Sequence, residues 1–415
     1  MKVRILFLTD NFPPEVNAPA SRTFEHCREW VKAGHQVTVI TGAPNFPTGK
    51  VFPGYRNRLW QRETMDGIEV VRVWTYIAAN AGVAKRTLDY LSFMVFGFLA
   101  GLVQRRPDVI VGTSPQFFTN CAAWMLSVFR WRPFIFELRD LWPESIKTVG
   151  AMQDSAALRL LECLELFLYR RAAAVVAVTE SFRRNLIARG IDGDQIAVIT
   201  NGVDLSRFQP MPRDPELAGQ LGLTDKFVAG YIGTHGMAHA LETLLEAAQR
   251  IAALPTSPEV HFVLLGDGAR KSALKATAKQ MGLKNVTFLD TVPKAEVPRY
   301  WSLLDVSIIH LRKSDNFTQV IPSKLFECMG MGIPVLHGVA GESADIVERE
   351  DIGRVFEPEN VEALGDGLLR LAGDQVRYQQ LRANALEAAP RYNRITLARK
   401  MLEILENIHA DRPSR

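Results

Sequence analysis

A proline, a serine and a lysine stand at the start of a predicted helix in the stretch FTQVIPSKLFECMGMGIPVL, residues 317–336. Pro322 ends the preceding segment, Ser323 is the expected N-cap, and two glycines end the helix before the buried strand that IPVL predicts. The free amides at the start of a helix attract anions, and Lys324 adds a positive charge beside them. This pattern is typical of an anion-binding site. A packed connection between a loop, a helix and a strand would produce it equally well.

A second turn that contains glycines occurs in GYIGTHGMAHALETLLEA, residues 230–247. Gly233 and Gly236 let the backbone approach an anion closely at the start of the helix that follows. His235 and His239 are four residues apart and could hold a metal ion, but no third ligand is evident nearby in the sequence. We therefore favour a phosphate contact, because a histidine in a loop can donate hydrogen bonds to anionic oxygens.

The predicted strand 3–10 leads into a proline-containing loop within TDNFPPEVNAPASRTFEH, residues 9–26. Asn17 lies in this loop, and Ser21 is the expected cap of the helix 21–34. The arrangement predicts a loop that approaches phosphate without the Gly-x-Gly-x-x-Gly fingerprint of dinucleotide-binding proteins. The missing fingerprint argues against a dehydrogenase. No Gly-Lys-Ser/Thr sequence follows a strand, which argues against a P-loop.

Charged residues also follow the apolar strand 134–138, in the stretch FELRDLWPESI. Arg139 and Asp140 stand at the end of this strand, and one interpretation is an exposed ion pair that contributes little. Asp140 is also close in sequence to Trp142 and Pro143, and aromatic faces stack on sugars while carboxylates accept hydrogen bonds from hydroxyls. We therefore predict that Asp140 contacts a sugar.

Strands and helices alternate in both halves of the chain. Apolar strand-like runs are separated by helical patterns, and the alternation restarts after the proline-rich stretch 201–216, which we interpret as a linker. The pattern predicts an α/β protein with two doubly wound domains, 1–205 and 206–390, and a C-terminal helix, 391–415, that packs back on the first domain. Ligands of such sheets bind beyond the carboxyl ends of the strands, so we expect a cleft where the two domains face each other.

The composition is that of an ordinary globular protein. Of the 415 residues, 47% are hydrophobic and 23% are charged, and the net charge is +4. This mild charge gives no support for nucleic-acid binding and is compatible with an anionic substrate or an anionic lipid. The four cysteines are scattered in apolar surroundings, so we expect reduced core residues of a cytosolic protein. We expect no signal peptide, because MKVRILFLTDNF enters a strand directly.

The segment LDYLSFMVFGFLAGLV, residues 88–103, is almost wholly apolar and has two basic residues on each side. It is shorter than the ~20 residues that a membrane span needs. One interpretation is a helix buried in the protein core. The other is a helix that enters one leaflet of a bilayer, with Phe93, Phe96 and Phe98 in contact with lipid. Four aromatic residues could form an interfacial rim beside it or belong to the core: Trp60, Trp124, Phe129 and Trp131.

Taken together and in this order, these motifs resemble the retaining glycosyltransferases of family 4, which have the GT-B fold of two facing Rossmann-like domains. The resemblance covers nearly the whole chain. It is carried by five motifs: the proline-containing loop 12–18, NGVDLSRF (201–208), GYIGTHG (230–236), LLGDG (264–268) and PSKLFECMGMGIPVL (322–336). The variants PSKLFE and RDLWPES are similar to bacterial transferases that build cell-surface polysaccharides, including those that transfer N-acetylfucosamine.

The resemblance implies roles for individual residues of a first, acceptor-binding domain and a second, nucleotide-sugar-binding domain. Glu327 would bind the ribose hydroxyls of the donor, the base would rest near Thr291 and Val292, and Asp140 would touch the donor sugar. The backbone of Val320, Ile321 and Ser323 would face the diphosphate or the sugar.

Two features depart from the family pattern. The family has two glutamates separated by seven residues, and the first falls here on Gln319. The family's basic diphosphate clamp is usually Arg and Lys, whereas the corresponding stretch offers His235 and His239, so Lys324 could supply the missing charge. The predicted catalytic set is therefore Asp140, Glu327 and His239, and the predicted donor-binding set adds Asn17, Gly233, His235 and the residues named above.

The function that the resemblance implies is transfer of a sugar from a nucleotide diphosphate, first of all a UDP-sugar, to a lipid-linked glycan. The expected acceptor is a polyprenyl-diphosphate-linked glycan of O-antigen, capsule or exopolysaccharide synthesis at the inner face of the plasma membrane. No cofactor and no metal would be required, since helix amides and cations would stabilise the departing diphosphate. The alternatives are a nucleotide-sugar epimerase or a phosphorylase on the same architecture, and a non-catalytic sugar-nucleotide-binding protein.

Overall fold

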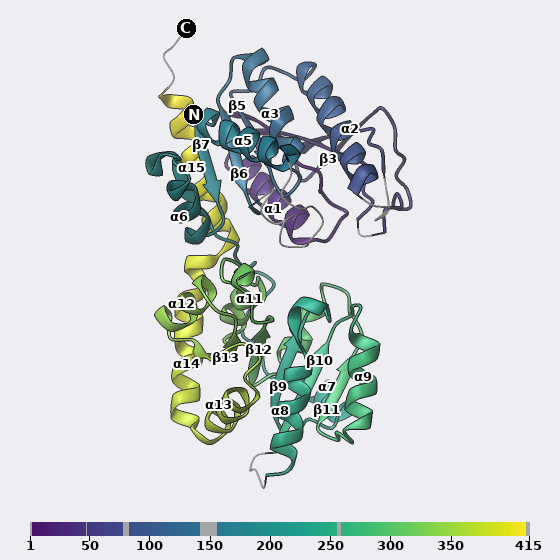
Figure 1. Ribbon diagram of the computed structural model, residues 1–415, viewed down its shortest axis with the longest axis vertical. Helices are drawn as coiled ribbons and strands as arrows, with labels where there is room; N and C mark the ends of the chain where they lie inside the picture. The colour runs from purple at the N-terminus through teal and green to yellow at the C-terminus, as the bar shows by residue number, and fades with distance from the viewer. Residues whose placement is uncertain (1, 47, 78–82, 142–155, 255–258, 412–415) are drawn as a thin grey trace. The chain divides into compact units, whose positions relative to one another are not determined.

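The computed structural model describes residues 2–46, 48–77, 83–141, 156–254 and 259–411 (Figure 1). The chain divides into two compact units. The first comprises Met1–Thr200 and Arg394–Arg415, and the second comprises Asn201–Asn393. Helix α15 (Arg394–Ala410) therefore belongs to the first unit, where it packs against α1 (Ala18–Lys32). The indole nitrogen of Trp30 on α1 donates a hydrogen bond to the carbonyl of Ala398, 2.8 Å away.

The first unit is built on a sheet with the strand order β3-β4-β2-β1-β5-β6-β7-β8, in which only the β3–β4 pair is antiparallel. The strands are β1 (Arg4–Leu8), β2 (Gln36–Thr41), β3 (Trp60–Met65), β4 (Ile68–Val73), β5 (Val109–Thr113), β6 (Phe134–Leu138), β7 (Ala174–Ala177) and β8 (Ile196–Val198). The strand order reverses at β1, which lies between β2 and β5. Ligands of open parallel sheets bind at such a reversal.

Helices cover both faces of this sheet, which explains why its central strands are continuous apolar runs. The remaining helices are α2 (Val83–Leu102), α3 (Phe117–Arg130), α5 (Ala156–Arg171), α6 (Glu180–Ala188) and the short η1 (Gly193–Gln195). Alternate side chains of β1 enter different cores. Leu6 belongs to the core that includes Phe93 of α2, and Phe7 belongs to the core that includes Trp30 of α1 and Met401 of α15.

The second unit has a sheet of parallel strands in the order β11-β10-β9-β12-β13-β14. The strands are β9 (Phe227–Ile232), β10 (Val260–Leu265), β11 (Val286–Leu289), β12 (Val306–His310), β13 (Val335–Gly338) and β14 (Gly353–Val355). The helices are α7 (Pro215–Gln220), η2 (Met237–His239), α8 (Glu242–Ala252), α9 (Lys271–Gln280), α10 (Val297–Trp301), η3 (Asp315–Phe317), α11 (Lys324–Met331), α12 (Glu342–Arg349), α13 (Val361–Gly373), α14 (Gln375–Ala388) and η4 (Ala389–Tyr392). Here the strand order reverses at β9. The two Rossmann-like units confirm the predicted fold class.

Three expectations about local structure are wrong. Asn17, not Ser21, is the N-cap of α1, because its Oδ1 accepts a hydrogen bond from the amide of Ala20 at 2.9 Å. The stretch 201–216 is not a free linker. Val203 and Phe208 are buried in the core of the second unit, and the amide of Val203 donates to the carbonyl of Tyr392. Of the cysteines, Cys163 is exposed, whereas Cys27, Cys121 and Cys328 are buried as expected.

The apolar segment 88–103 forms most of α2. None of the helices in the described ranges has the length and apolar character that a membrane crossing requires. Phe93 and Ala100 are buried in the core of the first unit, and α2 packs tightly on α3. A Cβ atom on Gly101 would lie 2.3 Å from the side chain of Leu126 on α3, so any other residue at this position would force Leu126 to move. One side of α2 therefore belongs to the protein core, in agreement with the first interpretation of the segment.

Candidate functional site

Two glycine-containing turns lie against each other where β9 and β10 end. The amide of Gly233 donates to the carbonyl of Leu265, and the amide of His235 donates to the carbonyl of Asp267 at 2.8 Å. A Cβ on Gly266 would lie 1.8 Å from the carbonyl oxygen of Gly233, so the two turns could not approach each other with any other residue at this position. This packing fixes the loop that follows the central strand of the second unit.

Lys324 reaches into this loop from the first position of α11. Its Nζ lies 3.7 Å from the centre of the Tyr231 ring, and a Cβ on Gly233 would be 2.8 Å from the same Nζ. The ammonium group is thus held by a cation–π contact with the Tyr231 ring. It lies beside Gly233, which has no side chain to block it. Burial lowers the pKa of Lys324 to about 8, and the negative charge of Glu327 acts in the opposite direction. The site therefore holds a cation that gains stability from an added anion.

Two histidines of the same loop are held in the neutral form. Burial, followed by the charges of Lys271 and Lys324, lowers the pKa of His235 to about 4. Burial and then Lys324 lower the pKa of His239 to about 4. Within the described ranges, both ring nitrogens of His235 and the Nδ1 of His239 are buried without a hydrogen-bond partner. A buried polar group without a partner costs free energy, and an oxyanion bound in this loop would accept a hydrogen bond from the one N–H group of a neutral ring.

A third histidine fixes the position of the second. The Nδ1 of His310, at the end of β12, lies 2.8 Å from the carbonyl oxygen of His239, and its Nε2 accepts from the amide of Glu359 at 2.9 Å. These two contacts require a neutral ring with the proton on Nδ1. His310 therefore orients the backbone that carries His239.

Ser323 stands at the start of α11, but it contributes to this start differently from what the sequence suggests. Ser323 is at the N-cap position, but its backbone is helical and its hydroxyl forms no capping hydrogen bond. The amides of Leu325 and Phe326 bond to the carbonyls of Pro322 and Ser323 instead. Glu327 follows one turn later and is half-buried. Gly332 ends the helix in a left-handed conformation with φ of 65°.

The loop before α11 contains the other residues predicted to face the donor. Gln319 is half-buried, Val320 is exposed, and the side chain of Ile321 is buried in the core of the second unit. The amide of Val320 donates to the carbonyl of Phe317 at 3.2 Å and so already has a partner within the loop. The loop is anchored from its other side, because the amide of Glu342 donates to the carbonyl of Thr318.

The predicted base-binding residues follow β11, the edge strand next to β10. Thr291 is exposed and Val292 is half-buried. Lys271, which is buried, joins the ends of the two strands, since its ammonium donates to the carbonyls of Gly266 and Leu289 at 2.7 and 3.0 Å and pairs with Asp290. Sequence reasoning missed Lys271, and its position three residues after LLGDG was the available signal.

In the second unit, the structure thus brings together Gly233, His235, His239, Lys324 and Glu327 around the end of β9. Thr291 and Val292 stand at the end of the neighbouring strands. Asn17 and Asp140 belong to the first unit. There, Asp140 follows β6 and is half-buried, and its amide and that of Arg139 donate to the Oγ of Ser114 at 3.3 and 2.7 Å. Trp142 and Pro143, predicted beside Asp140, lie outside the described residues.

A carboxylate that sequence reasoning did not select stands at the end of β1. Burial raises the pKa of Asp10 to about 7, and the nearby carboxylates of Asp89 and Glu15 raise it further than Arg86 lowers it. Asn11, the next residue, accepts a hydrogen bond from the Nδ2 of Asn17 at 2.6 Å. Asp10 and Asn17 therefore flank Asn11 at the reversal point of the first sheet. Asp10 and Asp89 are far apart in the sequence and come close only in the folded protein, so no local pattern revealed this site.

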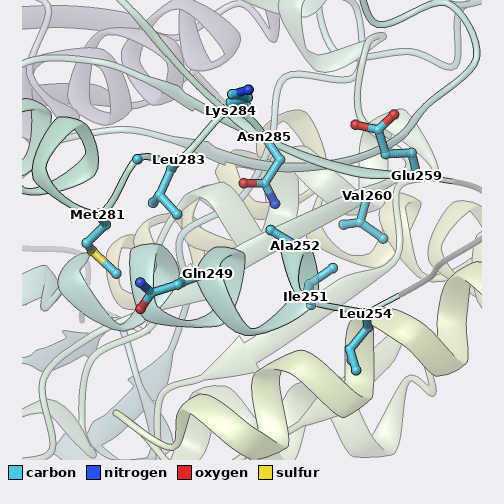
Figure 2. A pocket seen from close by; sticks show the side chains of 11 residues that line it. Gln249, Ile251, Ala252, Leu254, Glu259, Val260, Met281, Leu283, Lys284 and Asn285 are labelled. Carbon is cyan, nitrogen blue, oxygen red and sulfur yellow. The ribbon is translucent and has the colours of Figure 1, made fainter.

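The described residues contain no group of three or more His, Cys, Asp or Glu side chains that could hold a metal ion. The pair His235 and His239 is accordingly not joined by a third ligand there. A separate hollow of about 490 Å³ lies at the opposite edge of the second sheet, where β10 and β11 begin (Figure 2). Glu259, Val260 and Asn285 line it, so it is remote from the turns described above.

Comparison with known proteins identifies two domains. Residues 17–202 match the family described as Glycosyl transferase 4-like domain, and residues 226–374 match Glycosyl transferases group 1. A putative colanic acid biosynthesis glycosyl transferase, WcaI, of Escherichia coli is 27% identical over 88% of this chain and 91% of its own length. A GDP-mannose-dependent alpha-mannosyltransferase of Mycobacterium tuberculosis is 26% identical over 91% of this chain and 90% of its own.

A solved structure has the same fold along nearly the whole chain. The protein Alr3699/HepE of Anabaena, in complex with UDP, superposes with a TM-score of 0.71 and 19% sequence identity, covering 98% of this chain and 100% of that one. This likeness extends over both matched domains. The chain therefore belongs to the glycosyltransferases of the GT-B fold, with a glycosyl transferase 4-like domain followed by a domain of the glycosyl transferases group 1.

Proposed function

We propose that this glycosyltransferase moves a sugar from a nucleotide diphosphate to a hydroxyl of a lipid-linked glycan, with retention of the anomeric configuration. The first candidate donor is a UDP-sugar, and UDP-N-acetylfucosamine or a similar compound is the specific candidate. The first candidate acceptor is a polyprenyl-diphosphate-linked glycan in the synthesis of bacterial O-antigen, capsule or exopolysaccharide.

The observation that carries the donor proposal is the position of Lys324. Its ammonium group stands at the start of α11 and beside the Gly233 turn, where buried ring nitrogens of His235 and His239 lack partners. An ammonium group, helix amides and neutral imidazole donors together suit a diphosphate. Glu327, one turn further along α11, is the carboxylate that we assign to the ribose hydroxyls of the nucleotide.

The proposed reaction uses the departing diphosphate as its own base. The bond between the anomeric carbon and the β-phosphate oxygen breaks, and a bond from the acceptor oxygen to the same carbon forms on the same face of the sugar. The proton of the acceptor hydroxyl passes to the departing phosphate oxygen. Lys324 stabilises the negative charge that develops there through its ammonium group and through its amide at the first position of α11, so the reaction needs no divalent ion. Asp140 is assigned to the hydroxyls of the donor sugar.

The relatives support a role in bacterial polysaccharide synthesis. They point to two candidate bases for the donor nucleotide, uracil and guanine. Three of them are named for the biosynthesis of colanic acid, teichuronic acid and amylovoran, which are bacterial polysaccharides. The solved structures of HepE contain UDP and UDP-glucose, whereas the mycobacterial relative is named as dependent on GDP-mannose. We place uracil first because the structural match covers 98% of this chain and 100% of HepE.

A lipid-linked acceptor would lie in a membrane, and we propose that the enzyme works as a peripheral protein at the inner face of the plasma membrane. The exposed apolar side chains of Val95 and Leu99 on α2 support this proposal, because exposed apolar surface is costly in water.

The experiment that tests the proposed function is a donor panel with product analysis. The purified protein is incubated with UDP-, GDP- and ADP-sugars and a polyprenyl-diphosphate-linked acceptor, in the presence of EDTA. We expect transfer from a UDP-sugar, detected by mass spectrometry, and an unchanged anomeric configuration by NMR. Transfer from none of the donors, an inverted linkage, or a strict requirement for a divalent ion would contradict the proposal.

A further inference from the structure

One side of α2 exposes only apolar side chains over most of its length. Leu88, Val95 and Leu99 are 49%, 47% and 50% exposed, and Val103, just after the helix, is 66% exposed. Their spacing of seven, four and four residues places them on one side of a helix. The opposite side carries Phe93 and Ala100, which are buried in the core. The helix is thus apolar on both sides, and its outer side is not covered by the described residues.

The end of α3 continues this surface. Val128, Phe129 and Trp131 are 52%, 66% and 70% exposed. The rings of Phe129 and of Phe98 on α2 are in edge-to-face contact, with centroids 5.4 Å apart, and the Arg130 guanidinium donates to the carbonyl of Gln104 just beyond α2. The α2–α3 face is therefore one continuous surface, formed by Leu88, Val95, Leu99, Val103, Val128, Phe129 and Trp131.

Most charges around the α2–α3 face are positive, although Asp89 follows Leu88 on α2 and Glu69 lines the same hollow as Arg105. The sequence contains no Asp or Glu in residues 90–107 or 115–136. Arg105 and Arg106 follow α2 and are exposed, while Arg130 and Arg132 stand at the end of α3. Both helices connect parallel strands of one sheet, so their C-terminal ends lie at the same edge of it. The arginines therefore gather at one end of the apolar surface. Lys85 and Arg86, also exposed, lie near its other end.

We infer that the α2–α3 face docks onto a bilayer that contains anionic phospholipids. Leu88, Val95 and Leu99 enter the acyl region of one leaflet, and Phe129 and Trp131 lie at the level of the headgroups, where amphipathic aromatic rings are favoured. Arg105 and Arg106 bind lipid phosphates. The inference rests on the proposed lipid-linked acceptor for its purpose, but vesicle binding by this face can be measured without donor or acceptor.

The charge pattern favours a bilayer over a second copy of the chain as the partner. Two copies that packed through this face would bring two sets of arginines near one interface with no carboxylate from residues 90–107 or 115–136 to pair with them. Anionic headgroups instead neutralise the arginines while the acyl chains accept the apolar side chains. The bilayer is therefore the partner whose chemistry matches both parts of the surface.

The structure also changes which residues should be tested. Phe93 is fully buried, and Phe96 packs edge-to-face on Trp74 with ring centroids 5.2 Å apart. Replacing Phe93, Phe96 and Phe98 would therefore disturb the core, and loss of membrane binding could not be separated from unfolding. Val95 and Leu99 are suitable because their side chains are half-exposed and lie on the outer side of the helix.

Co-sedimentation with vesicles tests the inference. Vesicles of phosphatidylcholine with about 30% phosphatidylglycerol are compared with vesicles of phosphatidylcholine alone. The wild-type protein should bind the anionic vesicles preferentially. Val95→Ser with Leu99→Ser should weaken this binding about tenfold or more, because two apolar side chains no longer enter the leaflet. The matched control is Ile187→Ser with Val376→Ser, two exposed apolar residues on α6 and α14, which should bind as the wild type does.

A second pair of variants tests the charges. Arg105→Gln with Arg106→Gln should weaken binding to anionic vesicles about tenfold and make it less dependent on salt. Its control is Arg399→Gln with Lys400→Gln, an exposed cationic pair on α15 in the same unit. Thermal unfolding and UDP titration should be unchanged in all four variants, so a failure of this inference is distinguishable from a failure of the proposed donor site.

Three results would overturn the inference. The first is wild-type vesicle binding by Val95→Ser with Leu99→Ser. The second is equal binding to vesicles with and without phosphatidylglycerol. The third is a dimer in sedimentation velocity that the same double variant dissociates, since the α2–α3 face would then be covered by a second copy of the chain.

Discussion

The two sheets reverse their strand order at equivalent strands, β1 and β9, yet the side chains gathered at the ends of these strands carry opposite charge. At the end of β1, Asp10 stands near the carboxylates of Asp89 and Glu15. At the end of β9, Lys324 stands beside His235 and His239. The topology creates a binding position in both units, and a few side chains decide what binds there. Carboxylates suit sugar hydroxyls, and an ammonium group suits a diphosphate.

Burial acts on both positions in the same sense. It raises the pKa of Asp10 to about 7 and lowers the pKa of Lys324 to about 8, so each group is shifted toward its neutral form near physiological pH. A ligand of opposite charge reverses the shift. Bound diphosphate should therefore hold Lys324 in its charged form, and this gain contributes to binding. The following predictions test whether the contrast between the two loops governs function.

Replacing Lys324 by Ala should have the largest effect. Removing the ammonium group takes away a charge that stabilises the departing diphosphate, so we expect kcat to fall about 100-fold, in line with the loss of one oxyanion donor. The control is Lys226→Ala, because Lys226 pairs with Glu259 before β9 begins, at the opposite edge of the sheet. Turnover of the sugar nucleotide is measured for both variants. Equal turnover in the two variants would remove Lys324 from the reaction.

Replacing Glu327 by Ala should weaken the binding of UDP about tenfold, because the ribose hydroxyls lose a charged acceptor worth about 1.5 kcal/mol. Isothermal titration with UDP measures this. Glu246→Ala on α8 serves as the control, since Glu246 is exposed in the same unit. If both variants bind UDP as the wild type does, the assignment of Glu327 to the ribose is wrong.

The affinity for UDP should depend on pH through Lys324. Its charged form predominates below a pKa of about 8, so binding should be strongest below this value and should weaken up to about tenfold for each pH unit above it. His235 and His239, with pKa values of about 4, stay neutral over this range and contribute no step. Lys324→Arg should flatten the profile, because arginine stays protonated. A wild-type affinity that is constant from about pH 7 to about pH 9 would contradict the assignment.

Replacing Asp10 by Asn should have the smallest effect. This effect should concern the ligand that the first unit binds. We expect the KM for the acceptor to change about fivefold, the value of one hydrogen bond of about 1 kcal/mol. The wild-type KM should also change with pH across the pKa of about 7, whereas the variant should show no such step. Asp66→Asn, in the exposed turn between β3 and β4, is the control. A pH step that persists in Asp10→Asn would assign it to another group.

Much of the fold was predictable because its central strands are buried on both faces. Residues 5–8 of β1 and the whole of β9 are apolar without interruption, and such runs separated by helical patterns indicate a parallel sheet. The edge strand β3 was missed because its residues, WQRETM, alternate between half-buried and exposed positions and include charged side chains. The stretch 201–216 was predicted to be a linker because prolines and glycine are typical of linkers. Its residues Val203 and Phe208 nevertheless contribute to a core.

The donor site was predictable where a local motif carries it and unpredictable where the fold assembles it. Gly233 and Lys324 stand in motifs that can be read from the sequence. The contact between the Lys324 ammonium and the Tyr231 ring joins two motifs that are far apart in the chain. The environment of Asp10 likewise depends on Asp89, which only the packing of α2 brings near β1. Long-range charges of this kind leave no local pattern.

The most direct test of the central claim compares UDP with uridine by isothermal titration in EDTA, using the wild-type protein and Lys324→Ala at about pH 7. The claim is that Lys324 and the start of α11 hold the diphosphate without a divalent ion. We predict that the wild-type protein prefers UDP strongly over uridine and that Lys324→Ala loses most of this preference while its affinity for uridine is unchanged. A variant that retains the full preference for UDP would contradict the claim.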